Sequence, residues 1–71
     1  MREFQVGQRV TIGGESCTIR FIGKIPQWPE DVAVGVEWDN KLKGKNDGQL
    51  QNIRYFHTIK GLKTGSFLKE R

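Results

Sequence analysis

Residues that commonly carry chemistry are scarce in this 71-residue sequence, which has one cysteine and one histidine. One cysteine cannot form an internal disulfide, and Cys17 with His57 supplies too few ligands for a structural zinc site. We therefore expect no bound metal. We also expect a core held by packing alone, at a chain length where folding buries only about 60% of the unfolded surface. An unpaired cysteine is typical of a reducing compartment, so the sequence favours the cytoplasm.

Long apolar segments are missing as well. No run approaches the roughly 20 residues that are needed to cross a bilayer. Residues 1–4, Met-Arg-Glu-Phe, lack the apolar stretch of a signal peptide. The sequence therefore predicts no membrane partner.

Catalytic motifs are also absent. The sequence contains neither G-x-S-x-G nor a Walker A loop, and its one histidine lies far along the chain from its one cysteine. Catalysis needs convergent groups, such as a nucleophile beside a base. We expect a binding module that is not an enzyme and uses no cofactor, in which Cys17 and His57 are structural or surface residues.

Acidic residues are scarce in the second half of the chain. Residues 41–71 carry eight Lys or Arg against two Asp or Glu, a net charge of +6, whereas residues 1–40 carry four against six, a net charge of −2. A basic half suggests an acidic partner, such as a nucleic acid, a membrane surface or an acidic peptide. The alternative is that the lysines only keep a small protein soluble.

Glycine, by contrast, is plentiful, with nine residues, and alternating apolar residues predict short strands joined by tight turns. The predicted strands cover residues 6–12, 17–22, 33–38, 53–59 and 66–68. We expect a turn at Gly13-Gly14 and irregular structure over 26–31, where two prolines stand three residues apart. No segment has a helical period. The pattern predicts an all-β domain, either a compact barrel or a sandwich.

The same alternation predicts the core. We expect Phe21 to lie on the same strand face as Cys17 and Ile19. In the next strand we expect Val34, Val36 and Trp38 to lie on one face. Gly35, in mid-strand, indicates a bulge or a close backbone approach. The core residues that we expect are Trp38, Val34, Val36, Phe21 and Phe56.

The run Gly44-Lys45-Asn46-Asp47-Gly48 is the most informative part of the sequence. Two flanking glycines allow positive φ angles, and consecutive exposed N–H groups form an anion-binding concavity. Lys45 adds a charge and Asn46 an amide that donates and accepts. Such a loop could bind a carboxylate. The alternative is an ordinary polar hairpin turn.

This pentapeptide and its neighbours resemble the CAP-Gly domain family of cytoskeleton-associated proteins, whose signature is Gly-Lys-Asn-Asp-Gly. The other similar segments are Gly7-x-Arg9-Val10 with 18–23 (TIRFIG), 34–39 (VGVEWD), 53–56 (IRYF) and 65–69 (GSFLK). They occur in the family's order and spacing from about residue 6 to 70. The resemblance implies a small SH3-like β-barrel, and a single CAP-Gly domain over residues 1–71 that is a module of a longer protein.

The resemblance also implies a ligand, the acidic C-terminal tail Glu-Glu-Tyr or Glu-Glu-Phe of α-tubulin, which end-binding proteins share. The loop's N–H groups would form a nest for the terminal carboxylate, and the basic half of the chain complements the acidic tail. Phe67 and residues 26–29 would form a slot for the terminal ring, and Asp47 would order its own loop. The peptide-binding residues that we expect are Gly44, Lys45, Asn46, Asp47, Gly48, Phe67, Lys69 and Trp28.

Two positions depart from the family pattern. Ala33 stands where the family usually has a Trp that lines the groove. Lys69 stands where it usually has Arg, which keeps the charge but loses bidentate geometry. Trp28 either replaces the missing ring in the groove or is buried under its own loop.

Within the family, residues 21–29 and 33–39 look closest to tubulin-folding chaperone cofactors of the fungal type. This implies capture of α-tubulin during assembly or disassembly of the αβ heterodimer, and a cytoplasmic, cytoskeleton-associated location. The alternative in the family is a microtubule plus-end or dynein-adaptor protein that binds end-binding proteins. A nucleic-acid-binding β-barrel is a more remote alternative. No strand face alternates aromatic and basic residues as such proteins do, so we expect no nucleic acid partner.

Overall fold

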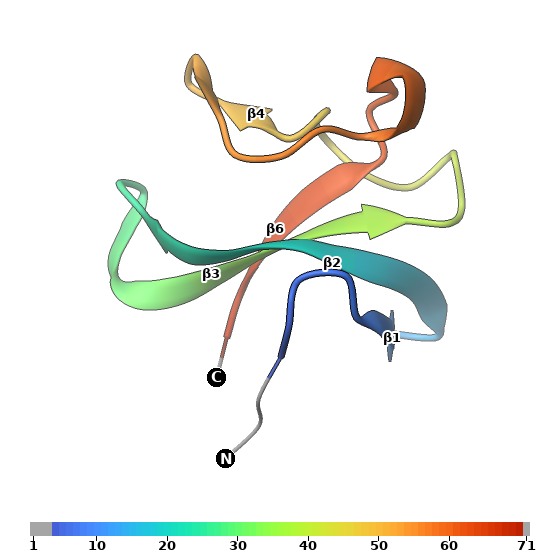
Figure 1. Ribbon diagram of the computed structural model, residues 1–71, viewed down its shortest axis with the longest axis horizontal. Helices are drawn as coiled ribbons and strands as arrows, with labels where there is room; N and C mark the ends of the chain where they lie inside the picture. The colour runs from blue at the N-terminus through green and yellow to red at the C-terminus, as the bar shows by residue number, and fades with distance from the viewer. Residues whose placement is uncertain (1–3, 71) are drawn as a thin grey trace.

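The computed structural model describes residues 4–70, in six β-strands and one short 3₁₀ turn (Figure 1). The bounds are β1 Arg9–Ile12, β2 Glu15–Ile25, β3 Trp28–Trp38, β4 Gln49–Leu50, β5 Ile53–Arg54, η1 Ile59–Gly61 and β6 Gly65–Lys69. Four strands form an antiparallel sheet in the order β1-β2-β3-β6, and β4 pairs with β5 in a separate hairpin. The prediction of an all-β fold is confirmed.

Residues 1–3 and Arg71 lie outside the described part. The expectation that residues 1–4 are not part of a signal peptide therefore concerns residues that lie mostly outside it. Within residues 4–70 no helix is long and apolar enough to cross a membrane.

The first hairpin forms where two glycines predict it. Gly13 and Gly14 have φ angles of 60° and 85°, the left-handed conformations that suit a two-residue hairpin turn. The preceding strand begins only at Arg9, later than predicted. The reason is a turn before it, in which the Gly7 N–H donates to the Ile19 carbonyl at 2.6 Å.

An extra residue in β2 changes which side chains face the core. Ile19 and Phe21 pair with two consecutive residues of β3, so Arg20 forms a β-bulge. Beyond it the alternation is reversed: Ile22 packs against the core and Phe21 turns to the opposite face. The prediction that Phe21 belongs to the core beside Ile19 is therefore wrong.

The segment over 26–31 is more regular than predicted. Residues 26–27 form a turn, and β3 begins at Trp28, which pairs with the last residue of β2. Pro29 fits into β3 because four residues between the paired Trp28 and Ala33 stand opposite a single residue of β2. A proline, which lacks the N–H, is tolerated at such a bulge.

The core face of the sheet is lined by five residues that are at most 6% exposed: Cys17, Ile19, Val34, Val36 and Trp38. The three members from β3 follow the predicted alternation. Burial raises the pKa of the Cys17 thiol above its ordinary value.

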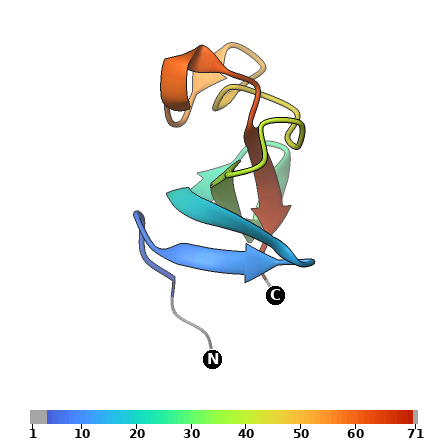
Figure 2. The ribbon, with the colours of Figure 1, turned by 90° about the vertical axis from the view of Figure 1, so that its right-hand side faces the viewer.

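The opposite side, which we call the aromatic face, bears Phe21, Gly35 and Phe67. Residues 39–64 cover it, while the N-terminal segment lies on the other side of the sheet (Figures 1 and 2). The covering segment contains the β4–β5 hairpin and η1. The four-stranded sheet therefore separates a mostly aliphatic layer from an aromatic one.

The Phe56 ring joins the covering segment to the sheet and is 7% exposed, which agrees with its predicted burial. A Cβ atom on Gly35 would lie 2.6 Å from Phe56 Cε1, and one on Gly65 would lie 3.1 Å from Phe56 Cζ. A Cβ atom on Gly48 would overlap the Phe56 carbonyl oxygen. Three glycines thus leave the space that this residue occupies, which explains the glycine in the middle of β3.

The strand predicted over 53–59 ends at Arg54. The reason is that Tyr55 and Phe56 both donate their N–H groups to one carbonyl, that of Gly48, at 2.8 and 3.3 Å. This geometry cannot continue a ladder of paired strands. It turns the chain so that the second aromatic side chain enters beneath the loop.

Glu37, a carboxylate only 6% exposed, attaches η1 to the sheet. Its Oε2 accepts the Ile59 N–H at 2.7 Å, and its Oε1 accepts the Arg20 Nε–H at 3.0 Å. These donors compensate the cost of burying a charge. They also fix where the covering segment rests on the bulge of β2.

Arg9 connects β1 to the end of β3. Its Nη1 donates to Asp39 Oδ1 at 2.7 Å and to Thr18 Oγ1 at 2.8 Å, and its Nη2 pairs with Asp39 Oδ2. The hydrogen bond from Arg9 holds the pKa of the Asp39 carboxyl below its usual range.

Acid should weaken the fold through Asp39. Its pKa is lower in the folded than in the unfolded chain, so its stabilising contribution is present at neutral pH. That contribution is lost below about pH 4, as the pH falls through the folded-state pKa. We expect Asp39→Asn to be less stable than wild type at about pH 7, and this difference in stability to shrink as the pH falls below about 4, measured by urea unfolding. A difference that does not shrink in acid would contradict this role of the charge.

Replacing Gly48 with alanine should reduce the stability of the fold far more than replacing Gly61 with alanine. Both glycines have positive φ angles, 95° and 68°, but their surroundings differ. A Cβ atom on Gly48 would lie 2.7 Å from the Phe56 carbonyl carbon, whereas one on Gly61 would have no atom of the described residues within 4 Å. We expect Gly61→Ala to cost about 1–2 kcal/mol for the left-handed backbone alone. Gly48→Ala should cost about 1–3 kcal/mol more, because the neighbouring backbone must move. Equal losses in denaturant unfolding would contradict the close packing at Gly48.

Candidate functional site

The loop of residues 44–48 is anchored to the first residue of β6. The N–H groups of Lys45 and Asn46 donate to the Gly65 carbonyl at 2.8 and 3.1 Å, and the Gly65 N–H donates to the Asn46 carbonyl at 2.7 Å. Gly44 approaches the backbone just before β6, where a Cβ atom would lie 2.6 Å from the Thr64 carbonyl carbon. The loop therefore has a fixed position relative to β6.

Three backbone amides of this loop are used inside the protein. Besides the two bonded to β6, the Gly48 N–H donates to Asn46 Oδ1 at 3.0 Å. The N–H groups of Lys45, Asn46 and Gly48 are therefore not free for the predicted carboxylate nest.

The side chains of the loop remain for a ligand. Lys45 is exposed, and Asn46 is half-buried. Because Asn46 Oδ1 accepts the Gly48 N–H, the amide group is oriented with its NH₂ as the part free to donate. A charged amine next to an amide donor, both held at a fixed place, is suited to bind a carboxylate.

Asp47 faces back into its own loop, as predicted. Its Oδ2 pairs with Arg54 Nη2 at 3.3 Å, and its carbonyl accepts from Arg54 Nη1 at 3.0 Å. The hydrogen bond from Arg54 is the largest cause of a pKa lower than usual for this carboxyl. Asp47 is thus committed to the loop's structure.

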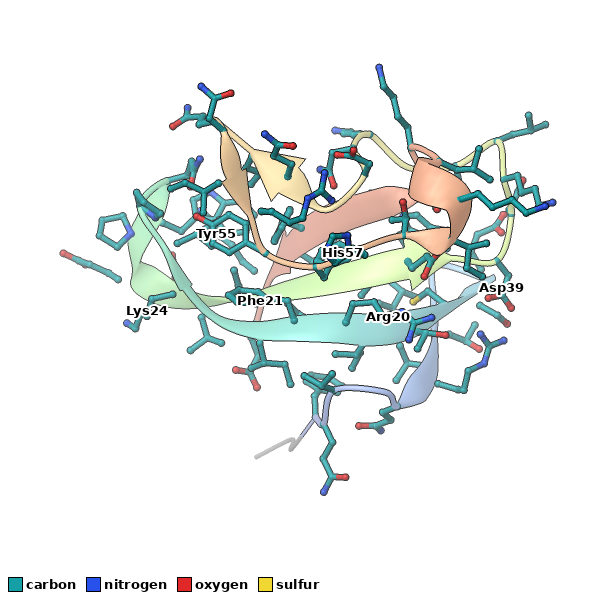
Figure 3. All side chains as sticks on the ribbon, turned by 45° about the horizontal axis from the view of Figure 1, so that its top comes forward. Arg20, Phe21, Lys24, Asp39, Tyr55 and His57 are labelled. Atoms are coloured by element: carbon teal, nitrogen blue, oxygen red, sulfur yellow. The ribbon has the colours of Figure 1, made fainter. Side chains whose placement is uncertain are left out.

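Four aromatic rings lie together beside the loop, on the aromatic face. Phe67 is 5.4 Å from Tyr55, 5.5 Å from Phe56 and 6.2 Å from Phe21, measured between ring centroids. Phe21 and Tyr55 are edge to face at 5.0 Å, and Figure 3 shows Tyr55 above Phe21 in the left half of the molecule, with Asp39 at the right. All but Phe56 are half-buried, so they offer apolar surface to a ligand.

Lys69 and Trp28 meet at the far end of β6. The Lys69 ammonium lies 5.4 Å from the centre of the Trp28 indole, and 4.0 Å from Asp31 Oδ2. Trp28 is half-buried. Ala33, where the family pattern has Trp, is completely buried and pairs with Lys69.

A hollow of about 680 Å³ brings together three of the predicted site residues but not the loop. Trp28, Phe67 and Lys69 line it, together with residues that mostly belong to the core side: Phe4, Val10, Thr11, Ile12, Ile19, Val34, Leu68 and Glu70. No residue of the 44–48 loop is part of this lining. The hollow and the loop are therefore two features that meet only along β6.

What unites the predicted residues is one side of β6. Side chains alternate along a strand, so Gly65, Phe67 and Lys69 lie on the same side. Gly65 holds the loop with Lys45, and Lys69 contacts Trp28. Four residues of strand span roughly 13 Å. The loop, the aromatic ring and the second cation form a row of that length.

Sequence reasoning missed Tyr55 and Arg54 as parts of this site. The adjacent pair Tyr55-Phe56 was a signal for Tyr55. Successive side chains of a strand point to opposite faces, so only one of the two rings can face the interior. The role of Arg54 depends on how the chain folds back onto the loop, which the spacing of residues along the sequence does not show. His57 is exposed, and the described residues hold no group of three or more His, Cys, Asp or Glu side chains suited to a metal ion.

Relatives of the chain include a yeast protein named PAC2 and vertebrate proteins named tubulin-specific chaperone E. Protein PAC2 of Saccharomyces cerevisiae is 48% identical over 67 residues, which are 94% of this chain and 13% of that protein. Tubulin-specific chaperone E of Danio rerio is 41% identical over 69 residues, 97% of this chain and 13% of that protein. The Homo sapiens protein of the same name is 42% identical over 55 residues, 72% of this chain and 10% of that protein. The chain thus spans about an eighth of the length of the first two relatives.

The family comparison covers nearly the whole chain. The family profile of the CAP-Gly domain matches residues 6–71, which include the glycine-flanked loop, the aromatic face and all of β6. The loop anchored on β6 and the strands around it are those of this domain, and the chain belongs to the CAP-Gly family.

Proposed function

We propose that this CAP-Gly domain binds the acidic, aromatic-ended C-terminal tail of α-tubulin, as the tubulin-binding module of a tubulin-folding chaperone in the cytoplasm. The observation that carries the proposal is the row along β6, with Lys45 and Asn46 at one end, Phe67 in the middle and Lys69 at the other end. The similarity to proteins named tubulin-specific chaperone E supports tubulin as the partner.

The length of the row suits a short extended peptide. A spacing of roughly 13 Å corresponds to about four extended residues. We propose that the terminal carboxylate meets Lys45 and the Asn46 amide, and that the terminal ring packs on Phe67. The preceding glutamates would then extend toward Lys69.

Charge favours the same ligand. The half of the chain that forms the loop and β6 has a net charge of +6, and Asp47, the acidic residue inside the loop, is neutralised by Arg54. Complementary charge accelerates association and selects an acidic partner. This binding role involves no catalysis, cofactor or nucleic acid.

The proposal predicts that both parts of the terminal residue matter. We expect a peptide ending in Glu-Glu-Tyr to bind, and its affinity to fall about tenfold or more when the tyrosine is deleted or its carboxylate is amidated, since a hydrogen bond to a charged group is worth about 1.5–3 kcal/mol. Isothermal titration calorimetry measures the three affinities. Equal affinity for all three peptides would contradict the proposal.

The same titration locates the contact with a matched set of variants. Lys45→Ala and Asn46→Ala should each weaken binding of the intact peptide while the domain stays folded. Lys41→Ala removes the same charge from an exposed position beside Arg9 and Asp39, so it should change the affinity much less. If Lys41→Ala weakened binding as much as Lys45→Ala did, only overall charge would be involved.

A further inference from the structure

Arg54 makes more side-chain hydrogen bonds than its exposed position suggests. Its Nη1 donates to the carbonyls of Asp47 and Phe56, at 3.0 and 3.1 Å. Its Nη2 donates to Asp47 Oδ2 at 3.3 Å and to Gln49 Oε1 at 3.1 Å. One guanidinium therefore connects the loop, the start of β4 and the residue whose ring lies under the loop.

The short hairpin places Arg54 where these acceptors converge. Gln49 and Arg54 are paired in the β4–β5 register, and the turn between the strands is closed by Gln51 and Asn52 with φ angles of 48° and 69°. Arg54 is thereby brought back beside Gly48, the last residue of the loop. A guanidinium has several donors in a fixed plane, whereas a lysine ammonium is a single point.

Asp47 is the part of the loop that depends on this contact. Main-chain hydrogen bonds hold its neighbours, since Lys45 and Asn46 donate to Gly65 and the Gly48 carbonyl accepts from the two residues after Arg54. Asp47, between them, has both its carbonyl and its carboxylate bonded to Arg54. Without Arg54 the end of the loop would lose its charged anchor.

We propose that Arg54 is the positioning residue of the peptide-binding loop, which it holds in the shape that presents Lys45 and Asn46 to the ligand without touching the ligand itself. This inference rests on the proposed function. It gives Arg54 contacts within the protein, in contrast to Lys45, which contacts the peptide. The two roles differ in the salt dependence of peptide binding, because salt screens the attraction between Lys45 and an acidic peptide, whereas removing the Arg54 and Asp47 charges together leaves the net charge near the ligand unchanged.

The experiment compares Arg54→Lys, Arg54→Ala and Asp47→Asn with Arg9→Ala. Arg9 is the matched control, an exposed arginine that makes three side-chain hydrogen bonds with Thr18 and Asp39. We expect both Arg54 variants to bind the Glu-Glu-Tyr peptide about tenfold more weakly than wild type. Asp47→Asn should lose less affinity, and Arg9→Ala should bind like wild type. The salt dependence of affinity should decrease in Lys45→Ala. It should stay at the wild-type slope in Arg54→Lys and in the double variant Arg54→Ala with Asp47→Asn, which removes both charges of the ion pair.

If Arg54→Lys bound the peptide with wild-type affinity, the inference would be overturned. A positive charge without the planar guanidinium would then be enough to hold the loop. A reduced salt slope in the double variant would also overturn it, by showing that the Arg54 charge meets the ligand. Amide hydrogen exchange at Gly48, measured without peptide, should be faster in the Arg54 variants and unchanged in Arg9→Ala. If the wild-type domain did not bind the peptide, the proposed function would fail, and this exchange would still decide whether Arg54 holds the loop.

Discussion

The ring of Phe56 lies where three glycines from separate segments, Gly35, Gly48 and Gly65, leave room for it. Gly35 belongs to the middle of β3, Gly65 begins β6, and Gly48 ends the loop. Any side chain at these positions would push the ring away, and with it the segment that covers the sheet. Together with the main-chain bonds between the loop and Gly65, this packing contact holds the loop relative to β6, and three glycines of the sequence make room for it.

That contact determines how the loop is used. Because the loop lies against Gly65, the N–H groups of Lys45 and Asn46 donate to β6 and that of Gly48 donates to the Asn46 side chain, so these three are not free for a ligand. The rigid loop thus presents a lysine and a half-buried amide at a set distance from Phe67. Pre-organisation of this kind reduces the ordering cost of binding, and it accounts for the interior use of Asp47, whose charge would otherwise repel an acidic peptide.

Alternation of apolar residues was enough to predict the all-β fold and the buried residues of β3, because burial on one face of a strand leaves that pattern. It failed at Phe21, since the single extra residue at Arg20 reverses the faces without leaving a signal in the sequence. The loop stood out from its own residues, two glycines around a lysine and an amide, and the family resemblance added its ligand. The internal bonds of three loop N–H groups could not be predicted, because hydrogen bonds between distant segments cannot be read from spacing.

The most direct test is to map the ligand on the domain by nuclear magnetic resonance. The isotope-labelled protein is titrated with the peptide ending in Glu-Glu-Tyr, and backbone amide and Asn46 side-chain shifts are followed. Binding along the aromatic side of β6 predicts that the largest changes fall on Lys45, the Asn46 NH₂ group and Phe67. Changes concentrated instead on Phe4 and Val10, in the hollow on the core side, would contradict it.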